Sequence, residues 1–224
     1  MKIFLDTADV YEIREAWETG LIDGVTTNPS LILKSKRELG KVANQLYSEF
    51  SEMESISTEV VADTHEEMLS QAKEYYTIGP NITIKVPCTV EGLKACKHLS
   101  SVGVKTNVTL VFSVAQAILA AKAGATYVSP FVGRLNDNSF SGVELIRAIC
   151  DTYRTHQVTT NVLSASLRDV HHVSRCFAAG SDVVTLPPSV FWKMYNHALT
   201  DQGLDRFNKD WQDALAQQEK NAKS

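Results

Sequence analysis

The feature that most constrains the fold of this chain is one repeated motif, in which a longer amphipathic stretch follows a short β-branched or aliphatic run. This alternation is typical of βα units that build a parallel sheet. The short runs predict eight strands, at residues 2–6, 24–27, 56–61, 82–86, 104–110, 126–131, 158–164 and 182–186. Helical patterns lie between them, at 8–19, 64–78, 90–101, 113–123 and 142–154.

Eight such units in about 200 residues allow roughly 25 residues for each unit. That length is at the compact end of the range for a (β/α)8 barrel. A small doubly wound sheet would hold fewer parallel strands. The sequence therefore predicts an α/β protein with a single-domain (β/α)8 TIM barrel over residues 1–200. An extra C-terminal helix and tail are expected over residues 201–224.

The expected terminal helix carries an apolar stripe. After Gly203, large apolar residues recur at helical spacing: Leu204, Phe207, Trp211 and Leu215. A stripe of this kind must be buried somewhere, and two arrangements satisfy it. The helix packs across its own barrel, or it packs on a neighbouring subunit.

Charge, leader and cysteine content exclude several classes of protein. The 22 basic and 26 acidic residues give a net charge of −4, which argues against a nucleic-acid partner. The first ten residues lack the apolar run of a signal peptide or membrane anchor, so we expect no membrane association and a cytoplasmic location. The four cysteines form no CxxC pair and have no histidine at zinc-ligand spacing, so we expect them to be reduced.

Strand parity places polar side chains inside the predicted barrel. Alternate residues of a barrel strand face the interior, and active sites lie at the carboxyl ends of the strands. In the fourth strand Ile82, Ile84 and Val86 form the face toward the helices. Thr83 and Lys85 then point inward. The same reasoning turns a mostly polar set inward from the other strands: Asp6, Thr26, Asn28, Ser57, Glu59, Lys105, Asn107, Thr109, Tyr127, Ser129 and Phe131.

An inward lysine at the carboxyl end of a strand predicts carbonyl chemistry. Desolvation favours the neutral amine, which attacks a ketone or aldehyde to form a Schiff base. Asp6 and Glu59 supply two carboxylates for separate proton transfers near Lys85. The alternatives are a lysine that reaches the surface and carboxylates that serve only as structural hydrogen-bond partners. The inward set contains no histidine, so we expect no metal site.

Two arginines indicate an anion site at the same mouth. Arg134 follows the sixth strand in SPFVGR, and Arg168 follows the seventh in SASLRD, with Ser164 and Ser166 near a helix start. Backbone N–H groups at a helix start and a guanidinium together bind phosphate, and phosphate sites in barrels often lie in the later loops. Ordinary surface ion pairs are the alternative for both arginines.

A family resemblance rests on motifs spread along the chain: LDTAD at 5–9, GVTTNPSLI at 24–32, IKVP at 84–87, TNVTLVFS at 106–113, SPFVGR, SASLR and VTLPPSV at 184–190. The chain resembles the small single-domain transaldolases, a group that also contains fructose-6-phosphate aldolases. The resemblance runs from residue 1 to about residue 215. It implies a (β/α)8 barrel, no cofactor, sugar-phosphate substrates and a Schiff-base lysine at Lys85.

The resemblance also implies a reaction and roles for the residues. A dihydroxyacetone unit passes from sedoheptulose 7-phosphate to glyceraldehyde 3-phosphate, giving erythrose 4-phosphate and fructose 6-phosphate in the pentose phosphate pathway. Asp6 would accept the C4 hydroxyl proton, and Glu59 would shuttle protons through a water that Thr109 also holds. The residues implied to contact or support the substrate are Thr26, Asn28, Asn107, Ser129, Phe131, Arg134, Ser166 and Arg168.

Two positions separate the branches of the group. The aldolases resemble one another in having glutamine and tyrosine where this chain has Glu59 and Phe131, so the resemblance favours transaldolase. The alternatives are a lyase, fructose-6-phosphate aldolase, and a non-catalytic barrel that binds sugar phosphates. The family also implies a homo-oligomer, a pentamer or decamer in which the terminal helix reaches a neighbour.

Overall fold

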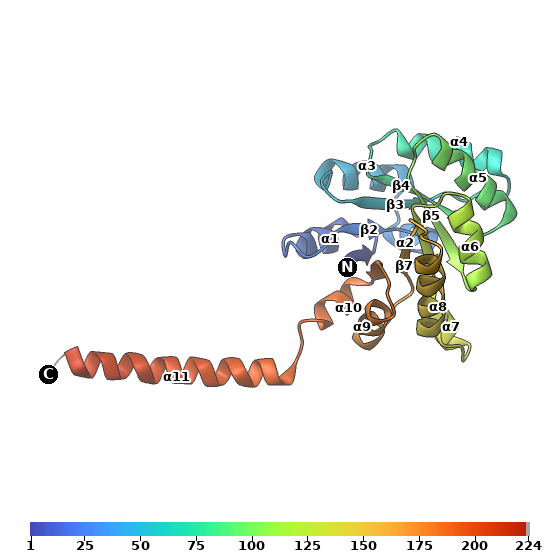
Figure 1. Ribbon diagram of the computed structural model, residues 1–224. Helices are drawn as coiled ribbons and strands as arrows, with labels where there is room; N and C mark the ends of the chain where they lie inside the picture. Colours follow the sequence, from blue (N-terminus) through green and yellow to red (C-terminus); the bar gives the residue numbers. More distant parts are fainter. Residues whose placement is uncertain (223–224) are drawn as a thin grey trace. The chain divides into compact units, whose positions relative to one another are not determined.

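The computed structural model describes residues 1–222 and contains a closed barrel of parallel strands in the order β1 to β8 (Figure 1). The bounds of the strands are β1 Lys2–Asp6, β2 Gly24–Thr26, β3 Ser55–Glu59, β4 Ile82–Pro87, β5 Thr106–Val111, β6 Tyr127–Pro130, β7 Asn161–Ser164 and β8 Val183–Leu186. Each strand pairs with the next, and β8 pairs with β1. The predicted (β/α)8 barrel is therefore confirmed.

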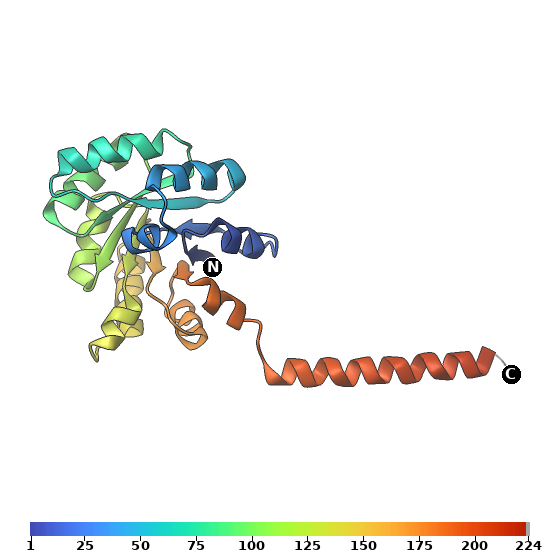
Figure 2. The ribbon, with the colours of Figure 1, turned by 180° about the vertical axis from the view of Figure 1, so that it is seen from behind.

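Helices follow the strands and cover the outside of the barrel, as the views from opposite sides show (Figures 1 and 2). Their bounds are α1 Val10–Trp17, α2 Pro29–Ser35, α3 Leu39–Glu49, α4 His65–Tyr76, α5 Val90–Ser101, α6 Val114–Lys122, α7 Val132–Asp137, α8 Gly142–Thr155, α9 Val170–Ala178 and α10 Pro188–Lys193. None of the described helices is both long and apolar enough to cross a membrane.

Side-chain caps explain where most of the predicted helices begin. Thr64, Thr89, Ser113 and Ser141 each accept a backbone N–H bond in the first turn of the helix that follows. Such residues satisfy amide groups that have no partner within the helix. The predicted ranges at 90–101 and 142–154 therefore fall within one residue of α5 and α8.

Some strands are shorter than predicted. The seventh begins at Asn161, because the Val158 amide bonds back to the Tyr153 carbonyl and the Thr160 hydroxyl bonds to the Ala125 carbonyl. These contacts commit residues 158–160 to a connection. A β-branched sequence alone does not distinguish such a connection from a strand.

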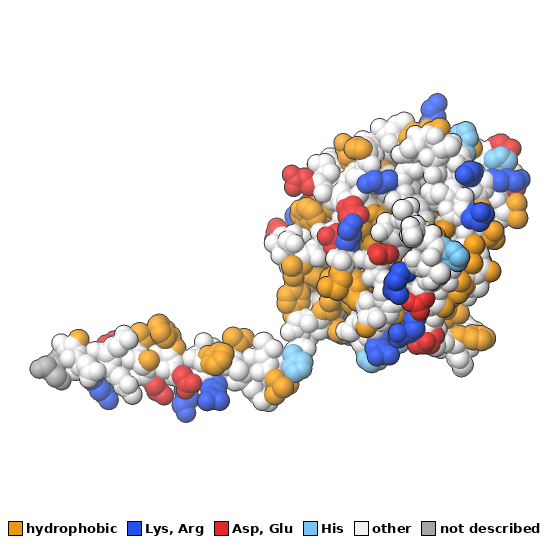
Figure 3. Space-filling model, viewed as in Figure 1, with side chains coloured by type: hydrophobic (Ala, Val, Ile, Leu, Met, Phe, Trp, Pro, Cys, Tyr) orange, Lys and Arg blue, Asp and Glu red, His pale blue; other side chains and the backbone are white. Residues whose placement is uncertain are grey.

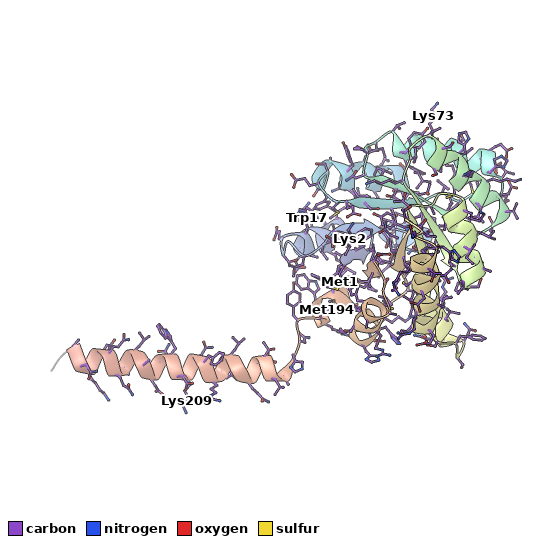
Figure 4. All side chains as sticks on the ribbon, in the orientation of Figure 1. Met1, Lys2, Trp17, Lys73, Met194 and Lys209 are labelled. Carbon is purple, nitrogen blue, oxygen red and sulfur yellow. The ribbon has the colours of Figure 1, made fainter. Side chains whose placement is uncertain are left out.

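An apolar cluster fills the barrel interior below the carboxyl ends of the strands. Phe4, Tyr127 and Leu163 belong to it, and the Phe4 and Tyr127 rings meet edge to face with centroids 5.8 Å apart. Gly24 leaves room for this packing, since a Cβ there would lie 2.8 Å from Cε1 of Phe4. Lys2 pairs with Glu54 at 2.6 Å; it is labelled in Figure 4 and lies at the amino end of β1, away from the carboxyl ends. Asp6 and Glu59, by contrast, are the last residues of β1 and β3, at the carboxyl ends of the strands.

The chain divides into two compact units, Met1–Phe191 and Trp192–Ser224. The second unit contains α11, Ala198–Ala222, none of whose described residues is buried. This helix begins at Ala198, three residues before the expected range of 201–224, and continues through Gly203. Figure 3 shows apolar side chains along one side of α11 and charged ones along the other, and Figure 4 labels Lys209 among the latter. The last two residues of the predicted tail, 223–224, lie outside the described residues.

Candidate active site

Lys85 lies inside the barrel, near the carboxyl end of β4. Its Nζ is 2.9 Å from Oε2 of Glu59 and donates to the Thr27 carbonyl oxygen at 3.2 Å. The register pairs Glu59 directly with Lys85 on the neighbouring strand. Both side chains face the same interior, with exposed fractions of 6% and 14%. The inward direction predicted for Lys85 is therefore observed, together with a carboxylate in contact with it.

Asp6 ends β1 and lies on the same mouth of the barrel. The Thr26 hydroxyl donates to Oδ1 of Asp6 at 2.8 Å. Burial raises the pKa of Asp6, while the charge of Lys85 and hydrogen bonds from Thr26 and Asn28 oppose that rise. Asp6 is therefore a carboxylate with a raised proton affinity, facing an amine. That combination suits a general base.

Amide and hydroxyl groups complete the polar interior. Ser129 donates to Oδ1 of Asn107 at 2.6 Å, and the Asn107 amide donates to the Ser57 hydroxyl at 3.4 Å. Asn28 caps the start of α2: its Oδ1 accepts the Leu31 amide at 3.0 Å, and Pro29 takes the first helical position. These contacts fix the orientation of each amide, so they present defined donors and acceptors to a ligand.

A cavity of about 130 Å³ opens among these groups. Most of the predicted site residues line it: Asp6, Thr26, Asn28, Lys85, Ser129, Phe131, Arg134 and Ser166. Ala165 and Thr185 line it too and were not predicted. Thr185 shares an inward parity on β8 with Val183, and applying the parity argument to that strand would have found it.

Thr109 does not line this cavity; it lies two residues after Asn107, at an irregular point of β5. The pairing of β5 with β6 shifts register between Val108 and Val111, and Leu110 has a φ of 58°. Bulges of this kind redirect side chains beside active sites. The Thr109 hydroxyl is buried and has no hydrogen-bond partner among the described residues. A buried hydroxyl in that state is a natural contact for a water molecule or a substrate oxygen.

The residues predicted to bind an anion lie on the other side of the mouth. The Arg134 guanidinium lies 4.9 Å from the centroid of the Phe131 ring, and Phe112 meets that ring edge to face at 5.8 Å. Ser166 has a left-handed backbone with φ of 60°. Gly133 packs directly under it, because a Cβ at that position would overlap the Ser166 carbonyl oxygen. Arg134 and Ser166 both reach the cavity.

Arg168 is held differently from the other predicted anion ligands. Its guanidinium forms two hydrogen bonds with the Asp137 carboxylate, at 2.5 and 2.6 Å. It lines a separate cavity of about 160 Å³, which shares only Ser166 with the first. The structure therefore brings Arg134 and Ser166 to the same cavity as Lys85, whereas Arg168 lines only the neighbouring cavity.

One group of side chains in the described part of the chain has a spacing suited to a metal ion: His65, Glu66 and Glu91, outside the barrel on α4 and α5. Glu91 already accepts hydrogen bonds from the His65 amide at 3.1 Å and from Lys94 at 2.7 Å. Those contacts lower its pKa to about 2. Lys94 contacts Oε1 of Glu91 and His65 contacts Oε2, so these residues form a surface ion-pair network.

Comparisons with known proteins agree with this geometry. Residues 3–221 match the model of the family described as transaldolase/fructose-6-phosphate aldolase. The chain is 52% identical over 211 residues to a probable transaldolase of Paracoccus denitrificans, covering 94% of this chain and 96% of that protein. It is 51% identical over 214 residues to a probable transaldolase of Brachyspira hyodysenteriae, covering 95% and 98%. A probable transaldolase of Brucella anthropi is 50% identical over 211 residues, with 94% and 96% covered. The chain belongs to the transaldolase/fructose-6-phosphate aldolase family.

Proposed function

We propose that this protein is a transaldolase that transfers a dihydroxyacetone unit between a ketose phosphate and an aldose phosphate. The observation that carries the proposal is the ion pair of Lys85 with Glu59, at 2.9 Å, in which Lys85 is buried and lines the same cavity as Asp6. An amine with its own proton acceptor and a second, separate base can run Schiff-base chemistry without any other group. The reaction we assign converts sedoheptulose 7-phosphate and glyceraldehyde 3-phosphate to erythrose 4-phosphate and fructose 6-phosphate.

The first step forms a bond between Lys85 and the ketose. Glu59 accepts a proton from the Lys85 ammonium, and the neutral amine adds to the C2 carbonyl. The adduct then loses its oxygen as water and becomes a protonated imine. A proton must reach the departing oxygen, and Glu59 lies within reach of the same nitrogen. The buried Thr109 hydroxyl is the group we assign to hold the water beside it.

The second step breaks the C3–C4 bond. Asp6 accepts the proton of the C4 hydroxyl, the C4–O bond becomes a carbonyl, and the electron pair of the broken bond moves into the protonated imine. An aldose phosphate leaves, and a three-carbon enamine stays on Lys85. An acceptor aldehyde then takes this unit by the reverse steps. Asn28, Asn107 and Ser129 are the groups we assign to its hydroxyls.

Phosphate binding fits the loop side of the cavity. Arg134 supplies a guanidinium that already lines the cavity, and Ser166 supplies its hydroxyl and backbone amide. Arg168 can reach the same position only by leaving Asp137. We therefore assign Arg134 and Ser166 as the resting phosphate contacts, and Arg168 as a contact that forms when a phosphate arrives.

Product analysis tests the function. We expect the protein, given fructose 6-phosphate and erythrose 4-phosphate, to form sedoheptulose 7-phosphate in a coupled assay. Free dihydroxyacetone as the main product would assign the chain to the aldolase branch of its family instead. Borohydride added with substrate should leave a three-carbon or ketose adduct on Lys85. No product and no adduct would leave only a barrel that binds sugar phosphates.

The branch argument has a test of its own at Phe131. This ring lines the cavity and has no hydroxyl, so it cannot help a proton or water release the three-carbon unit. Phe131→Tyr should raise the ratio of free dihydroxyacetone to transfer product, and Phe131→Leu should not. An unchanged ratio in the tyrosine variant would remove the argument that Phe131 favours transfer.

The exposed stripe on α11 supports a homo-oligomer, a pentamer or decamer. Leu204, Phe207 and Trp211 are each more than half exposed in the single chain. We assign a second copy of the chain as the partner of this stripe. Removal of residues 203–224, or Phe207→Glu with Trp211→Glu, should lower the mass measured by light scattering; Asp210→Lys on the charged side should not. An unchanged mass in both stripe variants would contradict the assignment.

Four free cysteines fit a reducing compartment, and we propose a cytoplasmic location.

A further inference from the structure

Thr185 on β8 lies at the end of a chain of hydroxyl groups that leads to Asp6. Its Oγ1 is 2.6 Å from Oγ1 of Thr26, and the Thr26 hydroxyl is 2.8 Å from Oδ1 of Asp6. We propose that Thr185 is a positioning residue for the reaction. By donating its hydroxyl proton to Thr26, it directs the Thr26 proton to Asp6. The proposal rests on the function assigned to Asp6 above, as the base that cleaves the C3–C4 bond.

The direction of the chain follows from counting protons. A threonine hydroxyl has one proton to donate. An ionised carboxylate only accepts, so Thr26 uses its proton on Asp6. The contact between Thr26 and Thr185 then requires the Thr185 hydroxyl to be the donor. The Thr26 oxygen thereby accepts a hydrogen bond from Thr185, and its own proton is directed toward Asp6.

The barrel topology holds the two threonines in place. β8 and β2 are the two neighbours of β1, and the register pairs Thr185 with Phe4 and Thr26 with Asp6. Their hydroxyls therefore meet across the inner face of β1, next to Asp6. Thr26 is 2% exposed and Thr185 is 3% exposed. Branching at Cβ leaves each side chain few rotamers in such a packed setting.

The chain also suits both protonation states of Asp6. When Asp6 takes a proton from the substrate, it becomes a donor, and Thr26 can accept that hydrogen bond and donate to Thr185 instead. Only hydroxyl rotations are needed, and no heavy atom moves. Hydrogen-bonded hydroxyls also polarise one another, so donation from Thr185 to Thr26 strengthens the bond from Thr26 to the Asp6 carboxylate. The charged groups that line the cavity with Asp6 are Lys85 and Arg134, and Glu59 is paired to Lys85.

Loss of the Thr185 hydroxyl should weaken the hydrogen bond from Thr26 to Asp6. That bond opposes the rise in the pKa of Asp6 that burial causes. The ionised form of Asp6 becomes less stable, its pKa rises, and the base is protonated at higher pH. The acid limb of the pH profile of kcat/KM then moves to higher pH. Attack of Lys85 on the carbonyl does not use Asp6, so the rate of Schiff-base formation should not change. If Thr185 served only for packing, Thr185→Val would keep activity, because valine has nearly the same shape, and Thr185→Ser would lose it.

The experiment compares Thr185→Val with Thr185→Ser, each with its pH profile and its rate of borohydride trapping. The valine variant should lose about 3- to 10-fold in kcat/KM at pH 7, the equivalent of one hydrogen bond between neutral groups. Its acid limb should move upward, while the rate of trapping of a ketose on Lys85 stays within 2-fold. The serine variant should restore the acid limb. A wild-type acid limb in the valine variant, or a serine variant as impaired as the valine one, would overturn the proposal.

A second measurement keeps the proposal testable if valine at 185 disturbs folding. Because Thr185 acts through Thr26, Thr26→Val and the double variant Thr26→Val/Thr185→Ala should have the same kcat/KM. Losses that multiply would overturn the proposal. Failure of the assigned function is distinguishable, since the unsubstituted protein would then form no adduct on Lys85.

Discussion

The two sides of the barrel mouth hold their polar groups in different ways. On one side Asp6, Glu59 and Lys85 sit on strands, where Asp6 accepts a hydrogen bond from Thr26 and Glu59 pairs with Lys85. On the other side Arg134 and Arg168 sit on the segments that follow β6 and β7. The Arg168 side chain is 55% exposed, whereas that of Lys85 is 6% exposed.

This difference matches what the two sides must do in the proposed reaction. Bond formation and cleavage depend on fixed distances between amine, base and carbonyl, and rigid strands supply them. Phosphate capture must also be reversed, because one phosphorylated sugar leaves before another arrives. A guanidinium on a loop, with a second anion to return to, can move between two positions. In the proposed reaction, the mouth would combine a fixed chemical half and a movable binding half.

The largest expected effect comes from breaking the fixed half at Lys85. Lys85→Met should lower kcat by about 10⁴-fold or more, because the covalent intermediate cannot form. It should also cost about 3 kcal/mol of stability, the low end for a buried pair, since the Glu59 carboxylate loses its partner and its side chain is 14% exposed. Adding Glu59→Gln should recover much of the stability and none of the activity. Urea titrations and mass spectrometry after borohydride treatment measure the two effects. Normal turnover in Lys85→Met would refute the Schiff base.

Asp6→Asn separates activity from stability on the same side. We expect kcat to fall by about 10³-fold, within the range for loss of a general base. The folded pKa of Asp6 is raised by burial, so between the unfolded and folded pKa values the native state binds more protons than the unfolded state. Its contribution to stability is full below the unfolded pKa and falls as pH rises through the folded pKa.

The uncharged variant should therefore resist urea better than the parent protein at pH 7, and the gain should fade as the pH is lowered. Asp213→Asn on the exposed face of α11 is the matched control and should change neither property. A variant at position 6 that is less stable than its parent at pH 7 would show that burial does not dominate the free energy of this carboxylate.

The fixed half is also the half that the sequence predicted well. Side chains alternate along a strand, so one apolar face, that of Ile82 and Ile84, sets the direction of Lys85. Closure of the barrel then brings Asp6 and Glu59 to the same interior. No long-range detail is needed, because the register of parallel neighbours is set by the barrel itself.

Loop positions could not be predicted in the same way. The sequence places Arg168 near Ser166, but its direction depends on Asp137, a partner 31 residues away whose approach follows from how α7 packs. The bulge beside Thr109 depends on Leu110 adopting a conformation that non-glycine residues rarely take. These features arise from tertiary contacts, which local pattern does not contain.

Arg134→Met breaks the movable half while leaving the fixed half intact. We expect KM for fructose 6-phosphate to rise about 10- to 100-fold, the equivalent of one or two charged hydrogen bonds, with a much smaller change for unphosphorylated fructose. Methionine keeps an unbranched chain against the Phe131 ring, so the wall of the cavity stays packed. Arg147→Met, at an exposed position of α8, is the control. Equal losses with both sugars would show that Arg134 serves the fold of the mouth rather than phosphate.

Asp137→Asn should produce the smallest effect and sharpen the comparison most, because it tests movement instead of contact. The carboxylate competes with substrate phosphate for the Arg168 guanidinium, which it holds at 2.5 and 2.6 Å. An exposed ion pair is worth about 0.2–1 kcal/mol, so removing it should lower KM for phosphorylated sugars about 2- to 5-fold. KM for unphosphorylated fructose should stay the same. Asp151→Asn, which breaks the exposed pair with Arg154 on α8, is the matched control. A higher KM for phosphorylated sugars in Asp137→Asn would mean that Asp137 supports Arg168 in its binding position, and both halves of the mouth would then be fixed.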